Sequence, residues 1–91
     1  MKIELKKFGT LLISRPAGRE AFATAKAYIF PQAIKDNEII IDFAGVDVLS
    51  PSWADEFITG LKNLFGKCKI IYQNTENPSV KETLATLSAL T

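Results

Sequence analysis

Histidine is absent from this sequence of 91 residues, and cysteine occurs only once. The lack of histidine removes the commonest general base and the commonest transition-metal ligand. A catalytic triad with an imidazole base is therefore excluded, and a structural zinc site is close to excluded. We expect no catalytic residues, no metal and no other cofactor. Cys68 has no second cysteine with which to form an internal disulfide, which is typical of a reducing compartment.

Long hydrophobic runs and an excess of one charge are missing as well. Eleven basic residues nearly balance ten acidic ones, so the formal net charge is +1. Nucleic-acid-binding proteins usually carry a basic excess or a basic stripe. No segment is apolar over the length that a membrane span needs, and the first residues do not resemble a signal peptide. We expect a cytoplasmic protein that binds neither nucleic acid nor membrane.

The composition is otherwise that of a folded protein. Hydrophobic residues make up 47% of the chain and charged residues 23%, proportions typical of globular proteins. No linker, internal repeat or low-complexity segment divides the sequence. A chain of this length has room for one hydrophobic core, so we expect a single domain over residues 1–91.

The first part of the chain predicts two strands and a helix. Apolar and charged residues alternate over Lys2–Lys7, the pattern of a half-buried strand. Gly9 can turn the chain into a second strand at Thr10–Ile13, and we expect the two strands to pair as a hairpin. Ser14 is placed to cap a helix whose apolar residues recur at helical spacing until Pro31 ends it.

The rest of the chain alternates strands and helices. Glu38–Phe43 holds a β-branched run, typical of a central strand covered on both faces. A helix over residues 54–65, a buried strand at Cys68–Tyr72 and a helix from Asn77–Ser79 onward should follow. The order β-β-α-β-α-β-α predicts an α/β domain with three helices. Its sheet should have four strands, mostly parallel, beginning with the N-terminal hairpin. The free edge of such a hairpin would allow self-association, and the oligomeric state stays open.

The polar residues of most interest follow the central strand, at the sheet edge where open α/β folds bind ligands. Ser52 stands three residues before Asp55, which resembles a capping box, and makes Ser52 a candidate helix cap. Ser50, followed by Pro51, is a competing cap. The free amides of this helix start could also hold a phosphoryl group on Ser52, although Asp55 and Glu56 would repel it.

Trp53 and two arginines offer two interpretations each. Trp53 lies out of phase with the apolar stripe of its helix, so it either joins the core against the hairpin or forms an exposed contact with a partner. Arg15 and Arg19 flank the start of the first helix. They could pair with Asp42 or Asp47, or contact a partner.

The acidic residues of this edge suggest a different chemistry. Asp42 ends the central strand, and Asp47, Asp55 and Glu56 follow it. A cluster of carboxylates could hold Mg²⁺ or accept a phosphoryl group. More often, such carboxylates accept hydrogen bonds from loop amides or favour a helix start. No glycine-rich phosphate loop accompanies them.

The segment Ile39–Ser50, followed by Pro51–Phe57, resembles the core of STAS domains. These form bacterial anti-sigma-factor antagonists and the cytosolic domains of sulfate transporters. The chain is most similar to a bacterial STAS-like family of unknown function, which has a similar Asp-Phe-x-Gly-Val strand exit and Ala-Asp-Glu helix start. Ser14–Arg15 with Gly18 resembles the upstream signature of that family.

The resemblance implies a regulatory switch. In the antagonists, a serine at the start of the helix after the central strand is phosphorylated by a partner kinase, which releases the bound partner. Ser52 falls on that serine. The chain has Ser50 and Trp53 where the antagonist pattern has an aspartate and a glycine. The implied partner is an ATPase-type serine kinase or an anti-sigma-like protein.

Residues and resemblance together predict a non-catalytic, protein-binding regulatory module. Its expected contact surface comprises Ser50, Ser52, Trp53, Asp55, Glu56 and Arg15. Two other functions stay open. One is a small metal-dependent phosphoacceptor or enzyme that uses Asp42 and its acidic neighbours. The other is a module that senses an anion or a nucleotide at the helix start.

Overall fold

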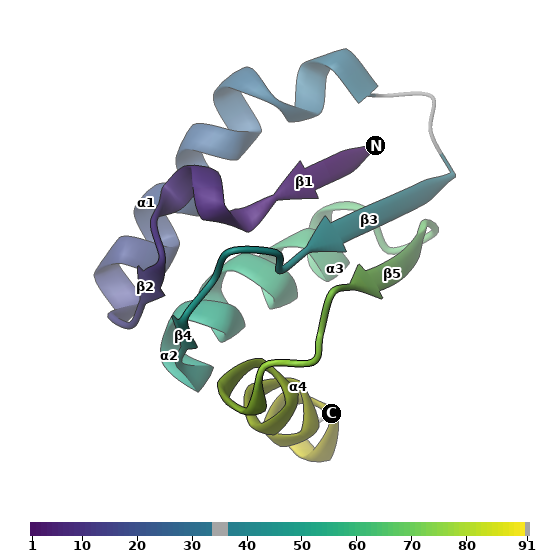
Figure 1. Ribbon diagram of the computed structural model, residues 1–91. Coiled ribbons are helices and arrows are strands. Elements are labelled where there is room, and N and C mark those ends of the chain that lie inside the picture. The colour runs from purple at the N-terminus through teal and green to yellow at the C-terminus, as the bar shows by residue number, and fades with distance from the viewer. Residues whose placement is uncertain (34–36, 91) are drawn as a thin grey trace.

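The computed structural model describes residues 1–33 and 37–90, and its strands form two separate parallel sheets (Figure 1). The larger sheet has the order β1 (Lys2–Glu4), β3 (Glu38–Asp42), β5 (Lys69–Gln73). The smaller sheet pairs β2 (Leu11–Leu12) with β4 (Val48–Leu49). The expected α/β class and the parallel pairing are confirmed, whereas a single four-stranded sheet is wrong.

The expected N-terminal hairpin is also wrong. After β1 the chain makes a 3-10 turn, η1 (Leu5–Phe8), which carries it forward instead of reversing it. β1 therefore pairs with β3, placing Ile3 opposite Ile41, and β2 pairs with β4, placing Leu12 opposite Leu49. The segment from β1 to β2 therefore pairs with the segment from β3 to β4 at two places. Between these two places both segments leave the sheet. A hairpin would need a tight turn that reverses the chain, and η1 does not reverse it.

The first helix begins and ends where the sequence predicts. α1 (Arg15–Tyr28) is capped by Ser14, whose Oγ accepts a hydrogen bond from the N–H of Ala17 at 3.2 Å. Pro31 lies beyond its end, in the 3-10 turn η2 (Phe30–Ala33). A proline lacks the amide that would continue the helix, which explains the stop.

The second and third helices complete the expected set of three. Residues 51–64 form one continuous helix, composed of α2 (Pro51–Ala54), the π-helical turn η3 (Asp55–Thr59) and α3 (Gly60–Leu64). The last helix, α4 (Pro78–Leu90), packs against α2 and β4. Within the described ranges, none of the helices has the length and apolar character needed to cross a bilayer.

The larger sheet is covered by helices on one face. α1 and the α2–α3 helix lie behind it in Figure 1. Ile39 and Ile41 face these helices and are fully buried, whereas Ile40, between them, is only half-buried on the opposite face. β5 is an edge strand whose middle residues are half-buried. The prediction that β3 is covered on both faces is therefore wrong, because a single layer of helices serves this sheet, and β5 is less buried than predicted.

Apolar side chains from both sheets and all three helices form the core. Burying each of the larger ones contributes roughly 1.5–3 kcal/mol relative to leaving it exposed. The largest fully buried side chains are Trp53, Phe43, Phe57, Ile3, Leu5, Leu12, Ile39, Ile41, Leu49, Ile58, Leu61 and Val80.

Gly18 allows α1 to touch the main chain of α2. A Cβ atom on Gly18 would lie 2.7 Å from the carbonyl oxygen of Trp53 and 3.0 Å from its Cα. Real side chains do not approach main-chain atoms so closely, so only glycine permits this helix spacing.

We predict that Gly18→Ala lowers the free energy of unfolding by about 1–3 kcal/mol, because overpacking would separate α1 from α2. This loss should exceed the gain of up to about 1 kcal/mol that alanine brings within a helix. Gly66→Ala is the control, since a Cβ atom there would meet only the Lys62 carbonyl oxygen, at 3.4 Å. Urea unfolding measures both variants. Equal stability of Gly18→Ala and the wild type would contradict the close contact.

Candidate functional site

Ser50 fixes the junction between β4 and α2. Its N–H donates to the carbonyl of Leu12 at 2.8 Å, and its hydroxyl donates to the carbonyl of Ile13. The same Oγ accepts a hydrogen bond from the N–H of Trp53 at 3.1 Å, which makes Ser50 the N-cap of α2. Of the two candidate caps, Ser50 is therefore the one used, and the capping-box interpretation of Ser52 is wrong.

The Ser52 side chain has no structural role at the helix start. It lies in the first turn of α2 and is half-buried. Its hydroxyl forms no hydrogen bond with the residues that the structure describes. The helix start does not depend on this side chain, because Ser50 already supplies the cap.

Trp53 belongs to the core. Its side chain is 1% exposed and stacks on Phe57, with ring centroids 5.1 Å apart and planes at 14°. Phe8, from η1, approaches both rings. Of the two interpretations of Trp53, direct contact with a partner is thus wrong. The indole instead holds the start of α2 against the core.

The arginines of α1 pair with the acidic residues of the second helix. Arg15 Nη1 lies 2.9 Å from Asp55 Oδ2 and 3.1 Å from Glu56 Oε1, and Arg19 Nη2 lies 3.3 Å from the same glutamate oxygen. The expected pairing with Asp42 or Asp47 is wrong. Arg15 extends across the contact between α1 and the second helix, which brings Asp55 and Glu56 within its reach.

These ion pairs shift the titration of all three central groups. Hydrogen bonds from Arg15 hold the pKa of Asp55 and the pKa of Glu56 below their usual ranges, and the Thr59 hydroxyl adds to the effect on Asp55. The same contacts raise the pKa of Arg15, led by that with Asp55. The arginines are substantially exposed, so solvent screens the network and its contribution to stability is small.

Asp42 closes the carboxyl end of the larger sheet. Its Oδ1 accepts hydrogen bonds from Asn74 Nδ2 at 2.7 Å and from the N–H of Ala44 at 2.9 Å, and Lys2 Nζ lies 3.6 Å from Oδ2. Asn74 donates from the left-handed backbone region, at a φ of 57°, which asparagine tolerates better than most residues. The hydrogen bond from Asn74 is the main cause of the lowered pKa of Asp42.

Two acidic residues of this edge, Asp42 and Asp47, are engaged in loop and main-chain contacts. Asp42 is bound within its own turn. Asp47 is exposed, and its main chain bonds to the Thr10 carbonyl and to Asn77 Nδ2. In the part of the chain that the structure describes, no three carboxylate or thiol groups converge as metal ligands would.

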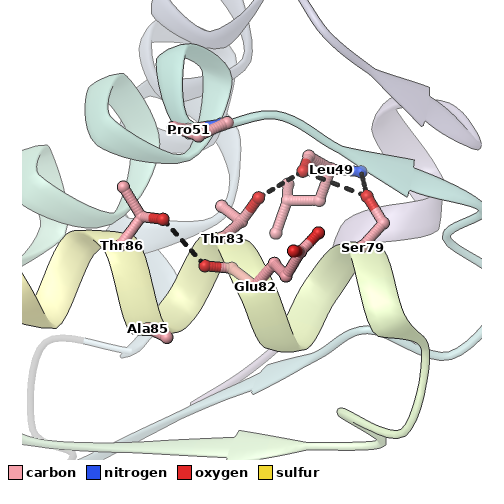
Figure 2. A pocket seen from close by; sticks show the side chains of 7 residues that line it. All are labelled: Leu49, Pro51, Ser79, Glu82, Thr83, Ala85 and Thr86. Atoms are coloured by element: carbon pink, nitrogen blue, oxygen red, sulfur yellow. Dashed lines mark hydrogen bonds between the residues drawn. The ribbon is translucent and has the colours of Figure 1, made fainter.

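α4 closes the outer edge of β4, as Figure 2 shows. The Ser79 hydroxyl accepts a hydrogen bond from the N–H of Leu49 at 3.0 Å and donates to its carbonyl at 3.3 Å. The buried Thr83 hydroxyl donates to the same carbonyl at 2.5 Å. Beside these contacts runs an open groove of about 540 Å³, lined by Leu49, Pro51, Ser79, Glu82, Thr83, Ala85 and Thr86. Among these lining residues Glu82 alone is charged, and its sign disfavours an anion or a nucleotide.

Three exposed apolar residues were missed by the sequence analysis. Leu11, Ile13 and Val48 are 60%, 52% and 39% exposed, and we call them the β2 face. Leu11 lies opposite Val48 in the smaller sheet. The signal was present in the sequence. Since strand residues alternate between faces, a strand with Leu12 in the core must turn its apolar neighbours outward.

Comparison with known proteins bears on this arrangement. A family described as a STAS-like domain of unknown function matches residues 27–80. The chain belongs to this STAS-like family. The matched residues are more than half of the chain and include β3, β4, the α2–α3 helix and β5. Neither the curated proteins nor the solved structures contain a significant match.

The match defines which parts of the site are shared with the family. It contains Asp42 and the whole Ser50–Glu56 turn. Ser14, Arg15 and Gly18, which resemble the upstream signature, lie outside it. The description of the family names no activity, so it identifies a STAS-like domain and no particular function.

We predict that Ser50→Ala lowers the free energy of unfolding by about 1–2 kcal/mol, because it removes a helix cap. Ser52→Ala should change it by less than about 0.5 kcal/mol, as at an ordinary surface position. Urea unfolding of the two variants, side by side, separates the two serines. A larger loss for Ser52→Ala than for Ser50→Ala would contradict the assigned cap.

We predict that Asn74→Gly raises the pKa of Asp42 towards its usual value. Glycine keeps the positive φ and removes only the amide donor, so the carboxylate loses its strongest partner. Because the folded-state pKa of Asp42 lies below its unfolded value, its stabilising effect is present above the unfolded pKa and is lost as the pH falls. In Asn74→Gly that stabilising effect should be smaller, and its loss should be complete at a higher pH. Carboxyl-carbon NMR titration gives the pKa, and an unchanged value would contradict the assigned partner.

Proposed function

We propose that this domain is a non-catalytic regulatory module that binds another protein through the start of α2. Phosphorylation of Ser52 switches that binding off. The observation that carries the proposal is that Ser50 and Ser52 have different roles. Ser50 caps the helix, while the half-exposed Ser52 hydroxyl has no hydrogen bond to a described residue. Ser52 can therefore be modified without loss of the helix cap.

The proposed contact surface combines polar and apolar groups and is supported by the buried Trp53. Pro51 is exposed, and Ser52, Asp55 and Glu56 are half-buried beside it. Trp53 supports them from the core side without reaching solvent. Such a surface is pre-ordered, so a partner would not have to order it on binding.

A phosphoryl group on Ser52 would change the charge of this surface. Asp55 and Glu56 lie three and four residues further along the helix, on the same side as Ser52, so the added negative charge would meet two carboxylates. The phosphoryl group would also compete with them for Arg15, which both now bind. A partner that fits the unmodified surface would meet a rearranged one.

Membership of the STAS-like family supports the choice of partner. By resemblance to anti-sigma-factor antagonists, we propose an ATPase-type serine kinase or an anti-sigma-like protein of the bacterial cytoplasm. No nucleic acid, membrane or cofactor is required by this function.

We predict that Ser52→Glu weakens binding of that partner at least about tenfold, since the carboxylate imitates part of the phosphoryl charge. Ser52→Ala should bind as the wild type does. Thr24→Glu is the matched control, because it adds the same charge at an exposed position of α1, away from α2. Binding is measured by calorimetry with the partner purified from the native host. Equal affinity of Ser52→Glu and the wild type would remove the helix start from the interface.

Intact-mass spectrometry of the protein from its native host tests the modification itself. A phosphoryl adduct mapped to Ser52 is the expected result. A uniformly unmodified mass under conditions that release the partner would contradict the switch and leave a constitutive binding module.

A further inference from the structure

α1 and the α2–α3 helix advance side by side in the same direction. A Cβ atom on Gly60 would meet the Phe22 ring at 2.9 Å. Four residues earlier on both helices, a Cβ atom on Gly18 would meet Glu56 Cβ at 3.2 Å. Equal steps of about one helical turn show that the two helices run in register. One turn further back, Ser52 therefore lies opposite the start of α1.

A hydrogen bond between the segments before the two helices supports the same placement. The Ser50 hydroxyl donates to the carbonyl of Ile13, two residues before the start of α1 at Arg15. Ser52 follows Ser50 by two residues, just as Arg15 follows Ile13. Ser52 and Arg15 therefore lie between this hydrogen bond and the first contact of the two helices.

The guanidinium of Arg15 already reaches the side of the second helix that carries Ser52. Its Nη1 lies 2.9 Å from Asp55 Oδ2 and 3.1 Å from Glu56 Oε1. Helix residues three and four positions apart are neighbours, so both carboxylates lie beside Ser52. Both bind the same nitrogen, and no partner is seen for Nε or Nη2 among the described residues. Since a guanidinium has five N–H donors, Arg15 has donors left for another acidic group.

A phosphoryl group on Ser52 would attract this guanidinium more strongly than either carboxylate does. It carries a charge of roughly −1.5 to −2 at pH 7 and three acceptor oxygens. An arginine can bind a phosphoryl group through two parallel N–H groups at once, whereas Arg15 now gives each carboxylate a single contact from Nη1.

Asp55 and Glu56 differ in the partners that remain when Arg15 turns towards Ser52. Glu56 also lies 3.3 Å from Arg19 Nη2, so it keeps an ion pair. Asp55 keeps only the hydroxyl of Thr59, which donates to its Oδ1 at 2.9 Å. Asp55 is therefore the carboxylate that such a movement would release.

We propose that Arg15 binds the phosphoryl group of phosphorylated Ser52 within the same chain, and that this movement releases Asp55 on the partner-binding surface. The modification then alters two charged positions of that surface, the phosphoserine and the freed carboxylate. This role of Arg15 rests on the proposed phosphorylation of Ser52, but it is exercised within the chain and needs no partner.

The first test uses the full chain with phosphoserine placed at position 52 during synthesis. Phosphorus NMR titration gives the second pKa of the phosphoryl group, which is about 6 for phosphoserine. Arg15→Gln should raise this pKa by about 0.5 or more, because a contacting cation favours the dianion. Lys26→Gln is the matched control. It removes a positive charge from an exposed position about three turns further along α1, beyond the screening length, so the pKa should stay unchanged.

The second test detects the contact itself. Arg15 and Arg19 are the only arginines of the sequence, so each gives one separate Nε–H signal in the side-chain NMR spectrum. The Arg15 signal should move with the same midpoint as the phosphoryl titration, and the Arg19 signal should move much less. Arg15→Lys should restore part of the effect of arginine on the phosphoryl pKa. An unchanged pKa in Arg15→Gln would overturn the proposal, as would an Arg15 signal that does not follow the titration.

Binding of the partner is a separate readout. If phosphorylation releases the partner but Arg15→Gln leaves the phosphoryl pKa unchanged, the switch stands and the role of Arg15 is rejected. If the phosphoryl pKa depends on Arg15 but phosphorylation leaves partner binding intact, the role of Arg15 stands and the switch is rejected. Arg15 is 45% exposed, so melting temperatures close to that of the wild type should show that its variants fold.

Discussion

The hydroxyl of Ser50 connects parts of the chain that the sequence keeps far apart. It donates to the carbonyl of Ile13, 37 residues away, and accepts from the amide of Trp53 three residues on. With the main-chain bond to Leu12, this one residue joins β2, β4 and α2. The position of the candidate site follows from this junction, because it sets where α2 begins and turns Trp53 into the core.

Side chains supply main-chain hydrogen bonds that the short strands do not make among themselves. β2 and β4 have two residues each, too few to form a stable sheet alone. Ser79 and Thr83 supply the hydrogen bonds that a further strand would make with Leu49, and Asp42 with Asn74 closes the larger sheet. Buried main-chain groups need such partners, so polar residues of this kind are as structural here as the apolar core.

The two serines explain how the proposed switch would sit on a helix start without weakening it. In the antagonists that the chain resembles, an aspartate stands where Ser50 does, and aspartate is an equally good helix cap. In this chain Ser50 supplies the cap, and Ser52 lies in the first turn of α2. Trp53 replaces a glycine but lies in the core, so it does not add bulk to the proposed contact surface.

Short-range patterns in the sequence are enough to predict the local elements of this domain. Side-chain periodicity gave the central strand and the three helices, Ser14 gave the start of α1, and the Ile39–Phe57 segment gave the STAS-like family. These depend on neighbours within a few residues. Four other features emerge only when the chain folds: which strands pair, which serine caps α2, the contacts of Arg15 with Asp55 and Glu56, and the exposure of Leu11. Apart from the cap itself, which links Ser50 to Trp53 three residues on, each of these is a contact, or the lack of one, between residues some 30 to 40 positions apart, where local periodicity carries no information.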